Sequence, residues 1–461
     1  AGFRGGATPD TSDPRLDLGL TIDRIALKSL EAFAAEYISS ASGYVSGKVN
    51  VDDLTGRMKV TGSLKVNDIG MKILMLDETF RIPSDELILQ EEALVFNSFD
   101  IVDAKGEKLT IDGKIGFKEF QDFRFDLLVR TDNFRALNST AGTNDLFFGD
   151  LYLGMELKIT GDMALPVVGG TLQVNDKSKL TFIVPQMDPT LTDRTGIVEF
   201  VNPGSESYNR EPVVVDSLKQ STINGMDVGV DISIDKNAEV TMIIDKATGD
   251  YVRLKGEGLL SGGIDPSGKV SLTGRYEFHE GIYELNVSLI QRRFAIRKGS
   301  YILWTGDPLS ALMNITAVYE TRTAPLSLVE SSLGPVSAEQ RNRYLQRMPF
   351  TTELKVSGEL MEPEIGFDIV LNEENLQVSS DVLNTTKARL ARLRTDPPEL
   401  YKQVFALLLF NQFLAENPLS STSGGSTELM LRESAGRIIS QQLNRLAGNL
   451  VKGVDIEFDV D

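Results

Sequence analysis

Residues 269–278, with the sequence KVSLTGRYEF, alternate between polar and apolar side chains with a period of two. One face of this expected strand carries Val270, Leu272, Gly274, Tyr276 and Phe278. The same alternation recurs over residues 283–289, 313–319 and 365–371. A period of two with one apolar face is typical of half-buried antiparallel strands, because doubly covered parallel strands show continuous apolar runs. Most of the first 375 residues are therefore predicted to form strands.

Short repeats indicate how these strands are joined. ELKITG (156–161) and ELKVSG (353–358) are each followed, at the same spacing, by a proline and then a glycine. GSLKVND (62–68) returns as GTLQVND (170–176). Since proline cannot donate a ladder hydrogen bond, the pattern predicts strand, glycine turn, proline at a turn or edge, and next strand. Repeated hairpins of this kind predict an elongated sheet built from similar modules.

Helical periodicity is confined to a few segments. Apolar stripes predict a short amphipathic helix over residues 27–39 and further helices over 399–416 and 431–450. Pro397-Pro398 marks the start of the 399–416 helix. We divide the chain into four parts: a β-repeat module with the short helix (1–130), a second β-repeat module (131–245), a further β region (246–375), and helical segments with the start of a terminal strand (376–461).

The apolar strand faces must pack against something, because a one-sided sheet is stable only when its apolar side is covered. Helices are too few to cover about twenty expected strands. Two arrangements stay open: a sheet folded back on a dry core, or a trough whose apolar lining faces an apolar partner. The apolar run Val404–Phe410 is correspondingly expected either to pack on the end of the sheet or to plug an open end.

Composition excludes several classes of function. With 47 Lys and Arg against 66 Asp and Glu, the chain has a net charge of −19, which disfavours nucleic-acid binding. It has no cysteine and one histidine, His279, so thiol chemistry is excluded and zinc sites and Ser-His triads are disfavoured. Its longest apolar run, Val404–Phe410, is shorter than the ~18 residues that a spanning helix needs.

Two motifs suggestive of chemistry are better explained as structural. Residues 261–270 contain the glycine and lysine spacing of a phosphate loop, but Val270 replaces the hydroxyl residue and a strand follows, so we expect a hairpin turn. His279 precedes Glu280 and could act as a general base, but we expect a solvated turn residue.

The acidic residues suggest no site either. Asp231, Asp235 and Asp245 lack the spacing of a calcium loop and are expected on an outer face. A two-carboxylate glycosidase is disfavoured because aromatic residues make up 7% of the chain, with Trp304 its single tryptophan. We expect Trp304 either to pack at a strand end or to line a trough. No catalytic residue, metal or cofactor is expected.

A series of motifs runs through residues 247–320: Gly256-x-Gly258, Gly274-x-Tyr276, Gly281-x-Tyr283, Phe294-x-Ile296, Ile302-x-Trp304 and Gly306-Asp307-Pro308. With these motifs the segment resembles the C-terminal region of the TamB family, the translocation and assembly module proteins, in the form found in Bacteroidota-type Gram-negative bacteria. Residues 357–371 and 403–413 follow in the family's order, and residues 88–115 fit upstream. The resemblance covers nearly the whole chain.

The resemblance implies a mainly β fold: an elongated, curved, antiparallel-rich sheet forming an open, β-taco-like trough, with a short helical C-terminal segment. It implies a non-enzymatic periplasmic bridge that is anchored in the inner membrane and reaches the outer membrane. The implied partner is a TamA-like outer-membrane barrel protein, and the implied roles are outer-membrane protein assembly and phospholipid transfer. The anchor and the barrel-docking strands are expected outside this chain.

Under this resemblance, phospholipid acyl chains would contact a trough lined by Val270, Leu272, Phe278, Tyr283, Leu285, Val287, Leu289, Phe294, Ile296 and Trp304. Membrane contact would come from the anchor and from the 399–416 helix. The alternative is a scaffold or chaperone-like β platform that binds no lipid and pairs its edge strands with client strands. A sugar-binding or polysaccharide-active solenoid is a more distant alternative.

Overall fold

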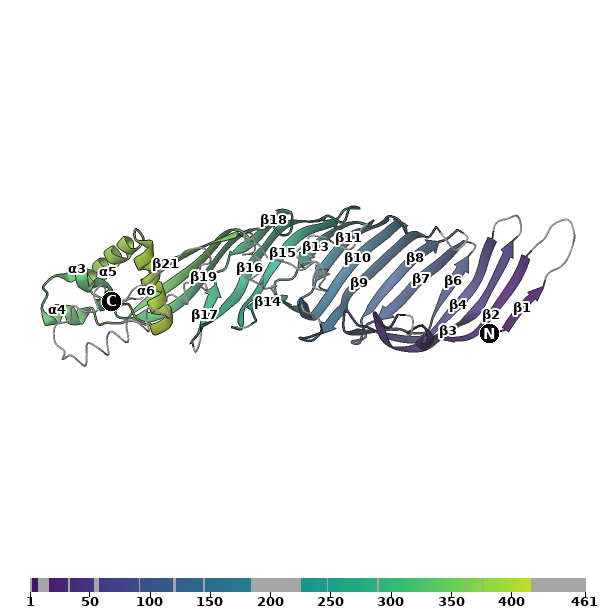
Figure 1. Ribbon diagram of the computed structural model, residues 1–461, viewed down its shortest axis with the longest axis horizontal. Helices are drawn as coiled ribbons and strands as arrows, with labels where there is room; N and C mark the ends of the chain where they lie inside the picture. Colours follow the sequence, from purple (N-terminus) through teal and green to yellow (C-terminus); the bar gives the residue numbers. More distant parts are fainter. Residues whose placement is uncertain are drawn as a thin grey trace, which may run out of the picture. The chain divides into compact units, whose positions relative to one another are not determined.

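We describe the chain from a computed structural model. The description covers residues 2–6, 16–31, 34–53, 58–90, 92–118, 122–143, 146–183, 225–246, 248–287, 290–360, 362–374 and 376–415. Within these residues the chain is mainly β, and its strands belong to one large mixed sheet of 21 strands (Figure 1). The predicted fold class is therefore confirmed, and the sheet is consistent with a β-trough.

The elements follow in chain order. The first half contains β1 (Gly2–Gly6), β2 (Leu16–Ala26), α1 (Lys28–Glu31), β3 (Ile38–Asp53), β4 (Met58–Ile73), β5 (Glu78–Ile82), β6 (Asp85–Gln90), β7 (Ala93–Val102), β8 (Lys108–Gly116), β9 (Arg124–Ser139), β10 (Phe147–Asp162), β11 (Pro166–Val174), β12 (Lys179–Ile183), β13 (Asp227–Ile234) and β14 (Glu239–Asp245). The second half contains β15 (Asp250–Ile264), β16 (Val270–Val287), β17 (Ile290–Ile296), β18 (Tyr301–Gly306), β19 (Leu312–Thr323), α3 (Leu326–Leu333), α4 (Ala338–Arg343), β20 (Met348–Glu359), β21 (Glu362–Leu371), α5 (Ser380–Leu393) and α6 (Pro397–Phe410).

These elements form two compact units. Unit 1 comprises residues 1–243, 255–276 and 303–308, and unit 2 comprises residues 244–254, 277–302 and 309–461. The division into four continuous parts stays a prediction, because each of the two units combines segments that are separated in sequence.

In unit 1 the strands are mostly antiparallel to their neighbours. β2, β3 and β4 pair in succession, as do β7, β8, β9, β10 and β11. Parallel pairing then enters, because β11 pairs with β13 and β12 pairs with β14.

In unit 2 the strands are antiparallel throughout the described pairings, which run from β16 to β17, β19, β20 and β21. Helices α3 and α4 lie between β19 and β20 in the chain, and α5 and α6 follow β21. Helix α4 begins with a capping box, in which Ser337 accepts from the Gln340 backbone N–H and the Gln340 side chain accepts from the Ser337 N–H. The sequence analysis missed this helix, although S-x-x-Q is its signature.

The predicted hairpin repeats are confirmed. ELKITG lies in β10 and pairs with β11 so that Gly161 faces Pro166. ELKVSG lies in β20 and pairs with β21 so that Gly358 faces Pro363. Both glycines have positive φ, 89° and 84°, which explains why glycine closes each strand. The two repeats therefore form hairpins with the same register.

The second repeat also has a shared geometry. Gly62 in β4 and Gly170 in β11 have φ values of 143° and 145°. A Cβ at either position would lie 2.0 Å from a carbonyl oxygen of the paired strand, that of Lys48 or Glu156. Only glycine fits here, because any side chain would collide with backbone that the ladder holds in place.

Replacing Gly170 with alanine is therefore expected to destabilise unit 1 by about 1–3 kcal/mol, the cost of a strained backbone. Gly229→Ala is the matched control, because Gly229 lies on the neighbouring strand β13 and has nothing within 4 Å of the added carbon. Hydrogen exchange of β10 and β11 amides would measure the difference. Equal protection in the two variants would contradict the prediction.

The structure changes two helix predictions. The helix expected over residues 27–39 is described as a helix only at Lys28–Glu31, and β3 already begins at Ile38, which pairs with Ile73. So short a helix is marginal, and strand pairing outcompetes it. The helix expected over residues 399–416 is α6, which ends at Phe410 because Asn411 adopts a left-handed conformation (φ 54°). The stripe over residues 431–450 lies outside the described residues.

The structure also tests the interpretations of the 261–270 segment and of His279. The 261–270 segment contains a turn between β15 and β16 in which Asp265 accepts backbone hydrogen bonds from Ser267 and Lys269, so the expected hairpin turn is confirmed. His279 does not lie in a turn, because it is an interior residue of β16. The strand expected over residues 269–278 continues as β16 to Val287.

Candidate functional site

One face of unit 1 is apolar over five neighbouring strands, as the strand register shows. One row across β10, β11, β13 and β15 places Met155, Leu172, Ile232 and Leu260 opposite one another. The parallel row across β9 to β15 contains Leu127, Ile159, Val168, Val228 and Ile264. Because side chains opposite one another in a ladder share a face, these residues form one continuous surface.

We call this surface the apolar strip and define it by the ten half-buried side chains Leu127, Met155, Leu157, Ile159, Val168, Leu172, Val228, Val230, Ile232 and Ile264. The opposite face of the same strands is polar and exposed, with Glu156, Lys158, Thr171 and Gln173 among its residues. Alternation of this kind separates an apolar from a hydrated side of one sheet.

The apolar strip is only partly covered. In the described part of unit 1 the one helix is the single turn α1, which packs near β2 and β3. The side chains of the strip consequently retain solvent exposure, whereas a closed sandwich would bury them. An apolar surface of this extent is typical of a binding site.

Nearer the N-terminus, the same face of unit 1 is better filled. Val49, Val60 and Phe117 form one buried cluster, and Val66, Ile69 and Phe99 form another. The half-buried side chains of the neighbouring strands pack against these clusters. The phenylalanines supply volume that the aliphatic residues of the strip lack, and here the face becomes a core.

A buried ion pair lies in unit 1 as well. Arg135 Nε is 2.6 Å from Glu78 Oε2, and both side chains are at most 9% exposed. Asp103 is also buried and accepts a hydrogen bond from the Arg135 backbone N–H at 2.7 Å. The pair joins β5 to β9 across 57 residues of sequence, so no local signal could have revealed it.

In unit 2 the corresponding apolar face is closed. A row across β17, β19, β20 and β21 aligns Ile296, Ala317, Leu354 and Phe367, all of them buried. The structure places α6 on this face, where Tyr401 and Phe405 contact the Phe367 ring edge to face at 5.3 and 5.5 Å between ring centres. The α6 residues from Val404 to Leu409 are themselves buried. This part of the sheet therefore has a dry core made by its own helix.

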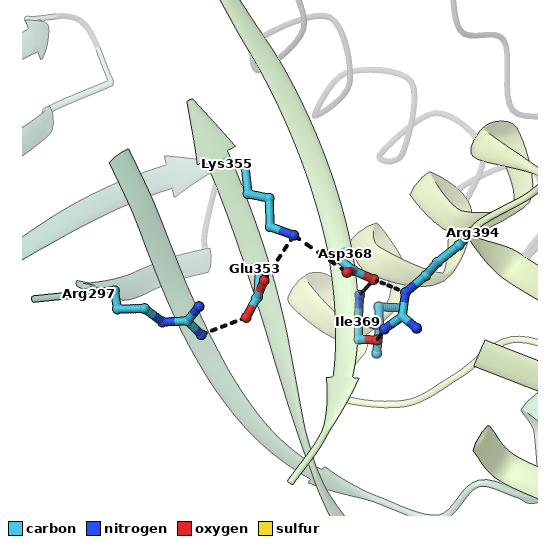
Figure 2. A network of polar contacts seen from close by, with 6 residues as sticks. All are labelled: Arg297, Glu353, Lys355, Asp368, Ile369 and Arg394. Carbon is cyan, nitrogen blue, oxygen red and sulfur yellow. Dashed lines mark hydrogen bonds and ion pairs between the residues drawn. The ribbon is translucent and has the colours of Figure 1, made fainter. Parts of the chain in front are cut away.

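The other face of unit 2 carries charge (Figure 2). Glu353 on β20 pairs with Arg297 at 2.6 Å and Lys355 at 3.2 Å, while Asp368 on β21 pairs with Lys355 at 3.5 Å. Arg394, at the end of α5, donates to the Asp368 carboxylate and to the Ile369 carbonyl. These contacts join β20, β21 and α5 on the side opposite α6.

The comparisons with known proteins bear on this arrangement. The family model of the TamB C-terminal domain matches residues 97–461, well over half of the chain. The chain belongs to the TamB family. No curated protein matches it significantly. TamB proteins are non-enzymatic, periplasm-spanning components of the translocation and assembly module, in which they work with TamA. The family resemblance stated from the motifs is thereby confirmed.

The ten side chains expected to line a TamB-type trough fall into two groups. Val270, Leu272 and Trp304 belong to unit 1, where Val270 is exposed and the other two are half-buried. Leu272 extends the apolar strip, since its side chain lies beside Gly262, which faces Val230 in the ladder. Trp304 Nε1 donates to the Pro308 carbonyl at 3.1 Å, which is the packing expected at a strand end before a turn.

The second group belongs to unit 2 of the TamB chain. Phe278, Leu285, Phe294 and Ile296 are buried, and Tyr283 stacks on Phe294 at 5.8 Å between ring centres. Val287 is described only as the last residue of β16, and Leu289 lies outside the described residues. The family resemblance implied all ten as one lining, and neither it nor the strand alternation distinguishes half-buried from fully buried positions.

Two tyrosines are buried deeply enough to favour the neutral phenol further. It raises the pKa of Tyr276 to about 12, and it raises the pKa of Tyr283 with a further contribution from Asp250. Both phenols are therefore neutral at physiological pH. Among the described residues there is no group of three or more potential metal ligands, and no helix combines the length and hydrophobicity required to cross a membrane.

Proposed function

We propose that the apolar strip of unit 1 binds the acyl chains of phospholipids, and that the chain serves the translocation and assembly module as a lipid-carrying bridge. The single observation that supports this most strongly is the register, which aligns aliphatic side chains from β9 to β15 on one half-exposed face. Each acyl CH₂ removed from water contributes about 0.8 kcal/mol, so contact with part of one chain already favours binding.

The proposal needs no catalytic group, because an acyl chain can slide along a surface without covalent chemistry. Aliphatic residues suit this role: they offer apolar contact without directional hydrogen bonds that would fix a ligand in place. The polar outer face keeps the same strands hydrated. Among the residues expected to line the trough, Leu272 extends this proposed surface, and Val270 alternates onto the same face of β16.

Family membership supports the cellular setting of the proposal. We place the apolar strip in the periplasm, with inner-membrane anchoring by a segment outside this chain and a TamA-like outer-membrane barrel as the partner. Transfer of phospholipid to the outer membrane, assembly of proteins in it, or both would use the same surface. The 399–416 helix proposed to contact a membrane includes α6, whose described residues instead pack on the sheet.

Leu172→Asp is expected to lower the phospholipid that copurifies with the chain by about tenfold, because losing ~1.4 kcal/mol of acyl contact changes affinity by that factor. The matched control is Gln173→Asp, which adds the same charge at the adjacent, exposed position of β11, opposite the uncharged Gly154 and Ser233. Organic extraction and mass spectrometry measure the bound lipid, and hydrogen exchange verifies that both variants are folded.

Two outcomes would oppose the proposal. Equal lipid in the two variants would show that the apolar strip is not the binding surface. A lipid-free parent chain would favour the scaffold alternative, in which edge strands pair with client strands and the role rests on the outer-membrane partner.

A further inference from the structure

Unit 2 contains an apolar face that is already occupied. Helix α6 covers β21 through Tyr401 and Phe405, and Phe413, just beyond the helix, meets Phe350 on β20 edge to face at 4.8 Å. Ile296 and Phe294 were expected to contact acyl chains. Both lie on the covered face, because Ile296 is in the ladder row of Ala317 and Phe294 alternates with it on β17. The apolar contact that a lipid would make in unit 1 is made here by the chain itself.

The C-terminal end of α6 is held by polar groups set into this face. Arg292 on β17 donates through Nε to the Leu408 carbonyl and through a terminal nitrogen to the Leu409 carbonyl at 3.2 Å. Asn411 Oδ1 accepts hydrogen bonds from Tyr319 at 2.7 Å and Thr321 at 3.1 Å. A cation here also complements the negative end of the helix dipole. We call Arg292, Tyr319, Thr321 and Asn411 the latch.

The groups of α6 that contact the latch and the apolar face have chemical counterparts in a phospholipid. A guanidinium that binds helix carbonyl oxygens binds phosphate oxygens at least as well. Acyl methylenes can replace the leucine and phenylalanine side chains of α6, since apolar burial has no directional requirement. Thr352 lies between Phe350 and Leu354 on this face, fully buried, and its hydroxyl has no partner. An unpaired buried hydroxyl costs free energy under any apolar cover, so it does not favour α6 over an acyl chain at this position.

We propose that α6 is a displaceable occupant of the unit 2 face, so that α6 and a phospholipid exclude each other there, with the latch setting how firmly α6 is held. This inference rests on the proposed lipid-binding function and extends it to unit 2. It explains how residues typical of an acyl-chain surface can be buried in the structure: their ligand position is filled by the helix.

A disulfide lock tests the exclusion. The chain has no cysteine, so Thr321→Cys with Asn411→Cys introduces the only pair, at positions whose side chains are in hydrogen-bond contact. The probe is phosphatidylethanolamine with a diazirine on its acyl chain, presented in vesicles, and labelled peptides are mapped by mass spectrometry. Oxidation is expected to lower labelling of residues 283–296 about fivefold relative to the reduced protein, a modest coupling between two ligands of one surface.

A second variant loosens the latch instead. Arg292→Ala is expected to raise labelling of the unit 2 face, whereas Arg322→Ala, which removes the same charge from the exposed side of β19, is not. Equal labelling of residues 283–296 in the locked and reduced proteins, including none in either, would overturn the proposal.

The apolar strip of unit 1 serves as the internal reference. If the strip is labelled equally with and without the disulfide, and labelling of residues 283–296 does not change either, the displaceable helix is refuted while the proposed function stands. Absence of labelling on the strip itself would refute the proposed function.

Discussion

Replacing Glu78 with alanine is expected to destabilise unit 1 by about 3–5 kcal/mol, because it leaves the buried Arg135 guanidinium without its counter-charge. Arg135 Nε lies 2.6 Å from Glu78 Oε2, and with side chains 9% and 1% exposed, water can compensate for little of the loss. The strands affected are β5 and β9, which carry the two residues. Hydrogen exchange of the β9 amides in increasing denaturant is the suitable measurement, because a chain of two units need not unfold in one step.

An exposed ion pair in the same unit supplies the control. Arg81 and Asp68 are 2.8 Å apart, but both side chains are more than 60% exposed. Arg81→Ala should therefore cost at most about 1 kcal/mol, because water and salt screen such pairs. A Glu78→Leu and Arg135→Leu double variant should recover part of the lost stability, since it removes both charges together. Equal effects of Glu78→Ala and Arg81→Ala would show that the buried pair has no special importance.

Phe405→Ala is expected to destabilise unit 2 by about 3–5 kcal/mol, the usual cost of emptying a buried phenylalanine site. The Phe405 side chain is fully buried, and its ring meets Phe367 edge to face, so truncation removes both volume and an aromatic contact. The void would open between α6 and β21. Protection of α6 and β21 amides against hydrogen exchange would report the change.

Phe410→Ala is the matched control, since Phe410 ends the same helix but is 37% exposed. Its truncation removes less buried surface and should cost clearly less, about 2 kcal/mol. If both substitutions changed protection of β21 equally, α6 would not be the cover of this face.

The hairpin repeats show what sequence patterns can predict. Gly161 and Pro166, like Gly358 and Pro363, are local signals whose meaning depends on backbone conformation alone: one allows a positive φ and the other cannot donate a hydrogen bond. Because that chemistry is the same wherever the residues occur, the turn between the two strands could be predicted, whereas their register came from the structure. The alternating strands were predictable for the same reason.

Helix ends were predicted less well. The 27–39 stripe has helical spacing, but Ile38 gains more by pairing with Ile73 in the sheet than by extending a one-turn helix. The end of α6 depends on Asn411, whose left-handed conformation is stabilised by partners on β19 that are distant in sequence. Such decisions depend on contacts between elements, which a window of sequence does not contain.

The candidate site likewise has features that the sequence predicts and features that depend on tertiary contacts. By itself, the sequence determined that the chain is mainly β, that each strand has one apolar face, and that its motifs are those of the TamB family, because these depend on side-chain type and spacing. Only the tertiary structure decided which apolar faces stay half-exposed and which are covered. Leu172 and Leu285 are indistinguishable by alternation, yet one lies on the partly open strip of unit 1 and the other is buried in unit 2. The difference is set by what packs on each face: α6 packs on the apolar face of unit 2, whereas α1 is the one helix in the described part of unit 1.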